Sequence, residues 1–459
     1  MNKHLLLFSY AFPPKNVVGS LRPYRLCRYL PDHNWLPTVL TERIDQRSLR
    51  SKLSMAGISP DIHIHRIHKL EPIKLLSKSL KWIKESRHAK APHPAATISK
   101  QGPPVLSYPQ TPPKTGAAKI KMMISDLFEN PDPMVLWSFF AFLKGASLLM
   151  KKDVRYHLIL STSPPHSSQI FGCLLAKAFG LPHIMDLRDP WTDISRGYQT
   201  PFRSRLERAM ENFVINYSAC IISSTNTYTE QLRKRYPDIP ENRFLTITNS
   251  FEEKKFNSIT EIPNERFVIS YLGIFYPKRD PYCFFRALKA WLDHYPERRN
   301  DLIFRIIGDS DPTTNNIINI LGISDIVEIT GRVDHEKAIQ LTKSSDLLLI
   351  ATGTGQATPR GWIPSKLFEY LACRKPILAN IPLGDASQII QSSNSGYVVH
   401  TDSVSEIFSI LDQEYSRKKS SENSAVDFFQ DEAQIMQYSS KTTIQQFAQA
   451  FDNAIIQER

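Results

Sequence analysis

The sequence predicts an α/β protein with two domains, each built on a doubly wound parallel sheet. Its 459 residues are more than one hydrophobic core usually organises, while 41% hydrophobic and 22% charged residues are typical of globular proteins. Short apolar segments alternate with stretches of helical periodicity, an order that favours parallel strands. This alternation starts again near residues 249–256. The second start indicates a second domain of similar design.

The first half opens with the strand, loop and helix of an α/β unit. Residues 4–12 are mainly apolar and predict a strand, because Pro13 and Pro14 follow them rather than the small residues of a signal-peptide cleavage site. A polar loop over 13–20 then leads into apolar residues at helical spacing. Further strands are expected at 35–41, 157–161, 183–186 and 219–223, with a helix over 170–178.

The second half repeats the pattern. Strands are expected at 267–272, 303–307, 326–329, 346–350 and 376–379. We therefore place the first domain at 1–250 and the second at 251–436, with a last segment at 437–459. That segment predicts an amphipathic helix, because Ile444, Phe447, Ala448, Phe451 and Ile455 share one helical face.

Two stretches depart from this alternation. Residues 76–120 are rich in Lys, Pro and Ser and lose periodicity after Lys90, which predicts a mobile insertion in the first domain. The beginning of this stretch, residues 75–84, favours either a basic amphipathic helix on a membrane surface or an ordinary packed helix. Residues 134–143 form an apolar run that Lys144 ends, so we expect a buried helix rather than a membrane span.

Charge is unevenly distributed along the chain. The net charge is +12, with +17 over residues 1–248 and −5 over residues 249–459. A basic half favours an anionic partner such as a membrane surface, a lipid phosphate, an acidic glycan or nucleic acid, although a merely solvated basic surface has the same composition. The five cysteines are well separated and form no Cys-x-x-Cys pair, which favours a reducing, cytoplasmic location over a disulfide framework or zinc ribbon.

Polar residues follow the expected strands of the first half, where open α/β sheets bind their ligands. Gly19 lies at a helix start, where backbone N–H groups can approach an anion, and Arg22 follows it. A plain turn is the alternative. His166 ends the polar segment that follows the strand at 157–161.

The segment Asp-Leu-Arg-Asp-Pro-Trp directly follows the strand at 183–186 and combines two carboxylates, a guanidinium and an aromatic ring. Asp186 and Asp189 suit base catalysis or the orientation of substrate hydroxyls, and Trp191 suits stacking on a sugar ring. A structural pair between Arg188 and an aspartate, with the other aspartate as a helix cap, is the alternative.

Basic residues follow the first strand of the second half. Gly273 begins the segment Gly-Ile-Phe-Tyr-Pro-Lys-Arg, in which Lys278 and Arg279 suit neutralisation of a leaving diphosphate. A solvated basic loop is the alternative.

The segment 361–371 carries the most specific pattern. Pro364 favours a helix start, which places Ser365 and Lys366 in the first turn, where N–H groups and the helix dipole favour phosphate. Glu369 lies on a neighbouring face of the same helix and suits ribose hydroxyls. An exposed salt bridge along the helix is the alternative.

These segments together resemble the family 4 glycosyltransferases of GT-B architecture over nearly the whole chain. Phe12-Pro13-Pro14 with Gly19 is similar to the N-terminal glycine loop, and Asn249-Ser250 to the interdomain Asn-Gly. Asp186 to Trp191 resembles the Asp-Phe-Arg-Asp-Pro-Trp signature of a bacterial cell-surface polysaccharide branch. The Val-Gly-Asp-Gly strand end of the family is similar to Ile307-Gly308-Asp309, and its Gly-x-Val is similar to Gly331-Arg332-Val333. The nucleotide-binding Lys-x-x-Glu helix of the family is similar to Ile363 to Leu371. The chain departs from the family at Gly361, the place of the first of two glutamates, at Val18 and at Ser250.

The resemblance implies two Rossmann-like domains that face each other across a cleft, with the last helix crossing back to the first domain. It implies an acceptor on the first domain, a nucleotide-sugar on the second, and retention of anomeric configuration without a metal or other cofactor. The implied nucleotide-sugar residues are Gly19, Gly273, Arg279, Gly308, Asp309, Arg332, Ser365, Lys366 and Glu369. The implied acceptor residues are Arg22, His166, Arg188 and Trp191, and the implied catalytic residues are Asp186, Asp189, Lys278 and Arg279.

The predicted function is transfer of a sugar from a nucleotide-sugar to a glycan or lipid-linked acceptor in the synthesis of a bacterial cell-surface polysaccharide such as lipopolysaccharide or capsule. We expect the protein in the cytoplasm, peripherally on the inner face of the membrane. A nucleotide-sugar epimerase or hydrolase of the same fold is one alternative. A non-catalytic basic scaffold that binds nucleic acid is another, although the sequence has no recognised nucleic-acid module, so we expect no nucleic-acid partner.

Overall fold

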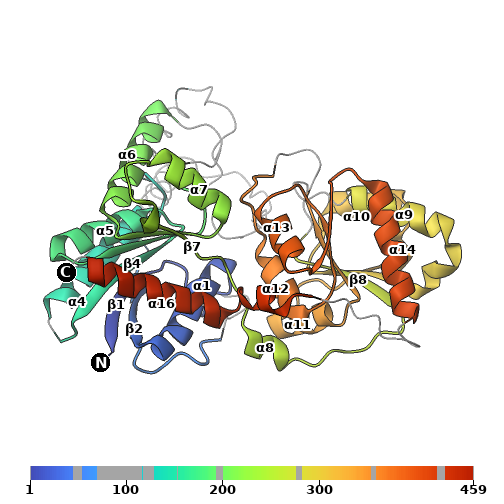
Figure 1. Ribbon diagram of the computed structural model, residues 1–459, viewed down its shortest axis with the longest axis horizontal. Helices are drawn as coiled ribbons and strands as arrows, with labels where there is room; N and C mark the ends of the chain where they lie inside the picture. The colour runs from blue at the N-terminus through green and yellow to red at the C-terminus, as the bar shows by residue number, and fades with distance from the viewer. Residues whose placement is uncertain are drawn as a thin grey trace, which may run out of the picture. The chain divides into compact units, whose positions relative to one another are not determined.

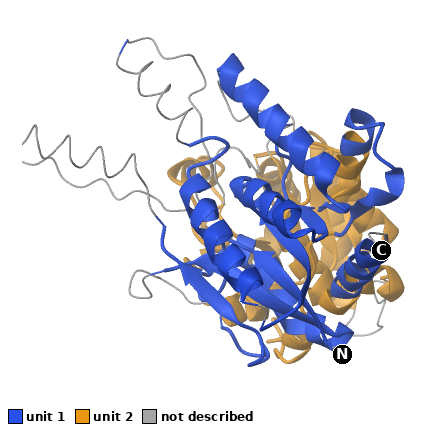
Figure 2. Cartoon of the chain, turned by 90° about the vertical axis from the view of Figure 1, so that its left-hand side faces the viewer, with its two compact units in different colours: residues 1–224, 232–247, 444–459 blue, residues 225–231, 248–443 orange. Residues whose placement is uncertain are grey.

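The computed structural model describes residues 2–44, 54–69, 116, 129–151, 153–192, 200–274, 282–352, 358–420 and 430–457. It has two compact α/β units, shown in Figures 1 and 2. Unit 1 comprises residues 1–224, 232–247 and 444–459, and unit 2 comprises residues 225–231 and 248–443. The chain contributes residues 225–231 to unit 2, enters unit 2 again after Ile247 and returns to unit 1 after Thr443.

Unit 1 is built on a parallel sheet. Among the described residues, its strands pair in the order β3-β2-β1-β4-β5-β6-β7. They are β1 (Lys3–Phe8), β2 (Trp35–Glu42), β3 (Ile64–Ile67), β4 (Tyr156–Ser163), β5 (His183–Leu187), β6 (Cys220–Ser223) and β7 (Phe244–Thr246). All pairings are parallel, so the carboxyl ends of the strands lie at one edge. The strand order changes direction between β1 and β4, the kind of position where open α/β sheets bind ligands.

Helices cover this sheet, and the last helix of the chain is one of them. They include α1 (Val18–Tyr29), α4 (Val135–Met150), α5 (Ser167–Phe179), α6 (Pro201–Tyr217), part of α7 (Asn226–Arg235) and most of α16 (Ser440–Gln457). Phe447 and Phe451 of α16 are buried in one cluster with Leu5 and Trp35. The apolar face predicted at 444–455 therefore packs on the core of unit 1.

Unit 2 repeats the design. Its described strands pair in parallel in the order β10-β9-β8-β11-β12-β13. They are β8 (Phe267–Leu272), β9 (Leu302–Ile307), β10 (Val327–Ile329), β11 (Leu347–Ala351), β12 (Ile377–Asn380) and β13 (Gly396–Val399). The helices are α8 (Glu253–Asn257), α9 (Tyr282–His294), α10 (Pro312–Ile320), α11 (His335–Lys343), α12 (Ser365–Cys373), α13 (Asp385–Ser392), α14 (Val404–Ser420) and α15 (Glu432–Met436). Here the strand order changes direction between β8 and β11.

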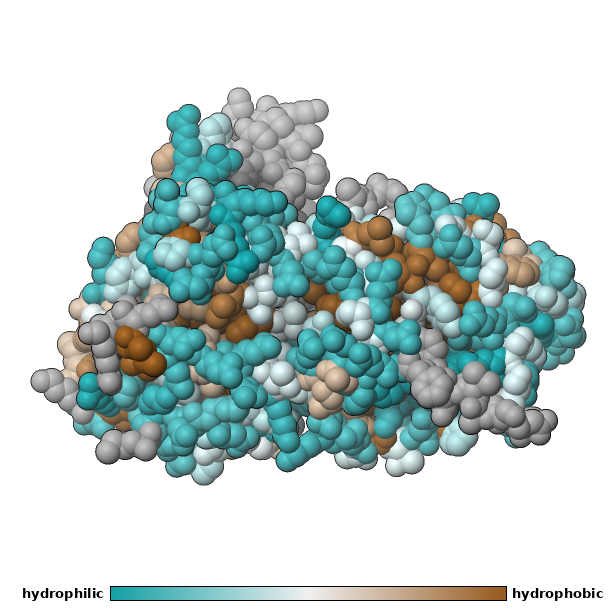
Figure 3. Space-filling view, in the orientation of Figure 1, coloured by the Kyte–Doolittle hydropathy of each residue, from teal (hydrophilic) through white to brown (hydrophobic). Residues whose placement is uncertain are grey.

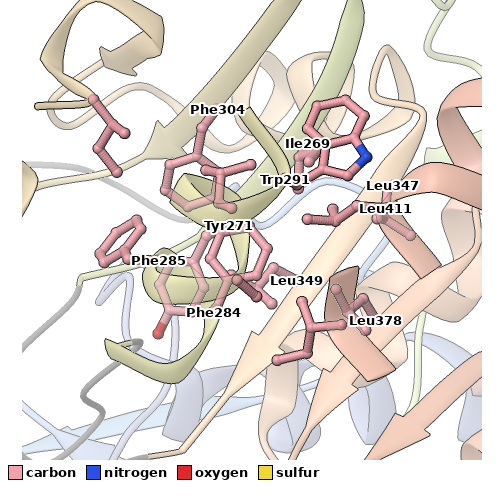
Figure 4. Close-up of a cluster of buried hydrophobic side chains, with 14 of the residues drawn as sticks. Ile269, Tyr271, Phe284, Phe285, Trp291, Phe304, Leu347, Leu349, Leu378 and Leu411 are labelled. Atoms are coloured by element: carbon pink, nitrogen blue, oxygen red, sulfur yellow. The ribbon is translucent and has the colours of Figure 1, made fainter. Parts of the chain in front are cut away.

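Aromatic side chains fill the core between α9 and the sheet of unit 2 (Figure 4). The ring of Phe304 lies 5.1 Å from that of Phe284 and 5.4 Å from that of Phe285, centroid to centroid. Tyr271, near the carboxyl end of β8, belongs to the same cluster and is 1% exposed. The core therefore fixes the end of β8.

Most expected strands lie within two residues of the observed ones. Two differences concern strands and one concerns a helix. The strand expected over 4–12 ends at Phe8, because the following residues turn away as a loop. The short strands β3, β7 and β13 were not expected. The helix expected over 134–143 is longer, and it is not fully buried: Phe139 and Leu143 are 40% and 46% exposed. Only the face of α4 that carries Trp137 and Ala141 meets the core.

The insertion expected over 76–120 lies outside the described residues, except for Gly116. Within the described part of the chain, no helix combines the length and apolar content needed to cross a bilayer. Hydrophilic residues cover most of the face drawn in Figure 3, and its apolar residues gather in a few groups.

Candidate active site

Two glycines shape the carboxyl edge of the sheet in unit 2. Gly273 follows β8 with φ 114°, and Gly308 follows β9 with φ 144°. A Cβ atom on Gly308 would lie only 2.5 Å from the carbonyl oxygen of Gly273. Both positions therefore require glycine, because each residue has a positive φ and the two backbones lie in close contact. The expected site glycines Gly273 and Gly308 thus lie side by side at this edge.

The start of α12 lies at the same edge. Pro364 has extended backbone at the N-cap of α12, and Ser365 and Lys366 form the first turn, as the sequence predicted. Lys366 is only 9% exposed, and its Nζ lies 3.3 Å from the centroid of the Tyr271 ring. A Cβ on Gly273 would be 3.5 Å from that Nζ. A largely buried cation at a helix N-terminus therefore stands beside Gly273, which itself lies against Gly308, and this arrangement suits phosphate.

Tyr370 connects α12 to the two strands between which the strand order changes direction. β8 and β11 pair at Ile269–Leu347 and Ser270–Leu348. Farther along, the Tyr370 hydroxyl accepts a hydrogen bond from the Leu272 N–H at 2.8 Å and donates one to the Leu349 carbonyl at 3.2 Å. Burial raises the pKa of this hydroxyl well above its usual range. Sequence reasoning missed Tyr370, because neither bond is visible in its neighbourhood along the chain.

Glu369 lies on α12 next to Tyr370, and its side chain is 20% exposed. Its Oε1 is 3.1 Å from Nε2 of His335, the first residue of α11. Nδ1 of His335 is in turn 2.6 Å from Nζ of Lys255 on α8. Neither His335 nor Lys255 was expected at the site.

Asp309 and Arg332 pair at the same edge. Nε of Arg332 donates to Oδ2 of Asp309 at 2.9 Å, and the two side chains are 59% and 43% exposed. Such an exposed pair contributes little to stability, so both groups are available to a ligand. The structure thus places the expected residues Gly273, Gly308, Asp309, Arg332, Ser365, Lys366 and Glu369 on the ends of β8, β9 and β10 and the start of α12.

In unit 1, Asp186 and Arg22 form a buried ion pair. Nη2 and Nε of Arg22 donate to the two carboxylate oxygens of Asp186 at 2.8 and 3.2 Å, and Thr162 Oγ1 donates at 2.7 Å. Nη1 of Arg22 donates to the Ile247 carbonyl at 2.9 Å, and the guanidinium lies 4.7 Å from the centroid of the Phe447 ring. Asp186 is fully buried and forms a structural ion pair, but its partner is Arg22 and not Arg188, the arginine of the structural alternative.

Arg188 links the end of β4 to the first turn of α1. Its guanidinium donates to the carbonyls of Ser163, Gly19 and Pro164 at 3.0, 2.5 and 3.2 Å. Gly19 lies in the first turn of α1, and a Cβ there would be 3.3 Å from Nη1 of Arg188. Arg188 and Gly19 are therefore brought together at the carboxyl edge of this sheet, where the Arg188 side chain fixes the backbone of Gly19, Ser163 and Pro164.

The aromatic ring expected to stack on a sugar is inaccessible in this structure. Trp191 is 1% exposed and stacks on His166, itself 2% exposed, with ring centroids 5.0 Å apart and planes 7° apart. The ring packs inward because apolar residues of β5 and α6 cover it, Leu187 and Val214 among them. Asp189, by contrast, is exposed. Lys278 and Arg279 lie outside the described residues.

Comparison with known proteins covers both halves of the chain. Residues 252–425 match the family model of glycosyl transferases group 1, and residues 81–250 match that of the glycosyl transferase 4-like domain. An uncharacterized glycosyltransferase of Methanocaldococcus jannaschii is 25% identical over 122 residues, which are 26% of this chain and 29% of that relative. The match thus spans less than a third of the relative's length.

Solved structures match nearly the whole chain. Sucrose-phosphate synthase from Thermosynechococcus elongatus has a TM-score of 0.59 at 12% identity, with 98% of each chain covered. The lipopolysaccharide outer core galactosyltransferase WaaB has a TM-score of 0.54 at 12% identity over the full length of both chains. TarM of S. aureus, in complex with α-GlcNAc-glycerol and UDP, has a TM-score of 0.55 at 9% identity, with 98% of this chain and 100% of that chain covered. At such identities these likenesses establish the fold.

Proposed function

Because the chain belongs to the family 4-like glycosyltransferases of GT-B fold, we propose that it transfers a sugar from a nucleotide-sugar to a glycan or lipid-linked acceptor. The proposal rests on the carboxyl edge of the unit 2 sheet, where Lys366 stands at a helix start beside Gly273, and Gly308 lies against Gly273. Few ligands other than a phosphorylated one suit a buried cation, closely approaching backbone and a helix N-terminus together.

In the proposed mechanism, unit 2 holds the donor. The diphosphate lies against Lys366, Ser365 and the backbone of the two glycines, while Glu369 accepts hydrogen bonds from the ribose. As the bond from C1 of the sugar to the diphosphate breaks, negative charge grows on the departing oxygen, and Lys366 and the dipole of α12 stabilise that charge. The acceptor oxygen forms the new bond to C1, and its hydroxyl proton passes to the departing diphosphate. The sequence predicts that Lys278 and Arg279 also stabilise the negative charge on the departing diphosphate.

Unit 1 holds the acceptor in this proposal. Arg188 fixes the backbone at the end of β4 and in the first turn of α1, at the carboxyl edge of the unit 1 sheet, and Asp189 offers an exposed carboxylate there. Asp189 is therefore the better candidate of the two aspartates for a contact with an acceptor hydroxyl, since its side chain is exposed whereas Asp186 is fully buried. Retention of configuration and independence from metal follow from the family resemblance and belong to the proposal.

Product analysis tests this function. We would incubate the protein with nucleotide-sugars and candidate acceptors and follow the acceptor by mass spectrometry, its linkage by NMR and its dependence on a chelator. Lys366→Met should lower turnover about a hundredfold, the scale of one lost electrostatic donor. Lys375→Met is a matched control, because Lys375 pairs with Glu261 on the same unit. Sugar conversion without an acceptor would instead support an epimerase or hydrolase.

We also propose that an anionic membrane supplies the acceptor on the cytoplasmic face. The support is the +17 charge of residues 1–248 together with the exposed apolar residues Phe139, Leu143 and Met150 on α4, whose helix also carries Lys144. Binding to vesicles should rise with phosphatidylglycerol content and fall with salt, and Phe139→Ser/Leu143→Ser should weaken it. Vesicle binding that does not depend on lipid charge or salt concentration would contradict this proposal.

A further inference from the structure

We propose that His335 and Lys255 are positioning residues that hold the Glu369 carboxylate in place to read the hydroxyls of a ribose. The inference rests on the proposed function, since it takes unit 2 as the site of a nucleotide. It adds two residues to that site which lie far from Glu369 in the sequence, and it assigns them a measurable role in the choice between ribose and deoxyribose.

The three side chains form a chain of hydrogen bonds across three helices of unit 2. Lys255 lies on α8, His335 begins α11 and Glu369 lies on α12. Nζ of Lys255 is 2.6 Å from Nδ1 of His335, and Nε2 of His335 is 3.1 Å from Oε1 of Glu369. The side chains of His335 and Glu369 are 32% and 20% exposed, so the chain ends at a surface that a ligand can reach.

The chemistry of the three groups fixes the direction of each hydrogen bond. An ammonium group can only donate, so Nδ1 of His335 must accept from Lys255. The neutral imidazole then carries its proton on Nε2 and donates it to Oε1 of Glu369. Among the described residues no group donates to Oε2 of Glu369, which leaves that oxygen to accept from a ligand hydroxyl.

The backbone on either side of this hydrogen-bond chain is itself fixed, both at His335 and next to Lys255. Asp334 caps α11, with its side chain accepting from the Lys337 N–H at 2.8 Å, which sets the backbone of His335. Phe256, next to Lys255, is 3% exposed and packs in a core cluster with Leu367 of α12. A carboxylate held by such a donor loses less rotational freedom when a ribose binds, so positioning favours binding.

The test measures how much each variant gains from the ribose hydroxyls. Calorimetry would give Kd for UDP, GDP, ADP and CDP, and for the 2′-deoxy and 3′-deoxy form of each nucleotide that binds. In the wild type, loss of the hydroxyl that Glu369 accepts should weaken binding about tenfold, the scale of one hydrogen bond to a charged group. His335→Ala should weaken the ribonucleotide five- to tenfold and leave the deoxynucleotide nearly unchanged, so that the ratio of the two Kd values approaches one.

A conservative variant and a matched control separate positioning from folding. His335→Gln keeps a donor near the place of Nε2 and should restore most of the ratio, and Lys255→Met should fall between it and His335→Ala. Lys337→Ala is the control on the same helix, because Lys337 bonds to Gln340. An equal loss of affinity for ribo- and deoxynucleotide in His335→Ala would show that His335 does not position Glu369, and it would leave the proposed donor site intact. If the folded wild type binds no nucleoside diphosphate, both the proposed donor site and the positioning role of His335 and Lys255 are overturned.

Discussion

Asp186 and Asp189 lie three residues apart in one segment, yet the structure gives them different surroundings. Asp186 is fully buried between Arg22 and Thr162, whereas Asp189 is exposed. Asp186→Asn should destabilise unit 1 by about 3–5 kcal/mol, because it leaves the buried guanidinium of Arg22 without its counter-ion. Asp189→Asn should cost less, because the Asp189 side chain is exposed to water. Urea unfolding followed by tryptophan fluorescence would compare them, and equal stability of the two variants would refute the buried pair.

His183 provides a pH-dependent contribution of defined sign. Burial lowers the pKa of His183 from 6.5 to about 3, and its ring nitrogens lie 2.8 Å from Ser218 Oγ and 3.1 Å from Ser161 Oγ. Between about pH 6.5 and 3 the unfolded chain binds a proton that the folded chain does not, so protonation favours unfolding as the pH falls. This site alone should lower the free energy of unfolding by about 1.4 kcal/mol per pH unit in that window.

The measurement for His183 is a pair of unfolding titrations across the same pH range. His183→Asn should be less stable than the wild type at pH 7.5, because a buried ring is lost, and the difference should shrink toward pH 4. A difference that stays constant with pH would mean that His183 takes up its proton in the folded protein as readily as in the unfolded one.

The local motifs predicted some site residues and missed others for a physical reason. Lys366 and Glu369 could be placed because a helix start fixes its own first turns. His335 and Lys255 could not, since their link to Glu369 depends on how three helices pack. Trp191 looked available for a sugar because it follows a strand end, yet its own apolar surface draws it into the core.

At the scale of elements, α12 depends on Tyr370 for its place on the sheet. Tyr370→Phe removes both hydrogen bonds of the hydroxyl and leaves the Leu272 N–H and the Leu349 carbonyl without it, which should cost about 1–3 kcal/mol. Because Lys366 and Glu369 lie on the same helix, nucleotide affinity should fall severalfold as well. The measurement is Kd by calorimetry together with thermal unfolding.

Tyr415→Phe is the matched control for Tyr370→Phe. The Tyr415 hydroxyl donates to Asp301 at 2.9 Å, a bond on α14 that does not involve α12. Its removal should lower stability with nucleotide Kd unchanged. The same loss of affinity in both variants would show that general loosening of unit 2, rather than the anchoring of α12, governs binding.

The elements themselves were predictable where the period of apolar residues was clear. The strand at 267–272 matches β8 residue for residue, since a buried parallel strand is apolar throughout. The three-residue strand β7 is too short to show a period, and α4 was misjudged because an apolar run does not reveal that Phe139 and Leu143 face outward.

For the whole molecule, the repeated alternation of strand and helix predicted two parallel α/β units, and the return of the last helix came from the family resemblance. The assignment of residues 225–231 to unit 2 was not predictable, because it depends on tertiary contacts: the Thr227 hydroxyl and N–H donate to the carboxylate of Asp385 at 2.6 and 2.9 Å. No local pattern joins residues so far apart in the sequence.

The central claim is that unit 2 binds a nucleotide-sugar through α12 and the ends of β8 and β9. The most direct measurement is thermal unfolding of the wild type and Glu369→Ala with UDP, GDP, ADP, CDP and their sugars. Glu406→Ala is the control, because Glu406 is an exposed glutamate on α14 of the same unit. A ligand at a hundred times its Kd stabilises the native state by about 2.7 kcal/mol. We predict that one nucleotide family stabilises the wild type and Glu406→Ala but not Glu369→Ala. Absence of stabilisation in a folded wild type, or equal stabilisation of Glu369→Ala, would contradict the account.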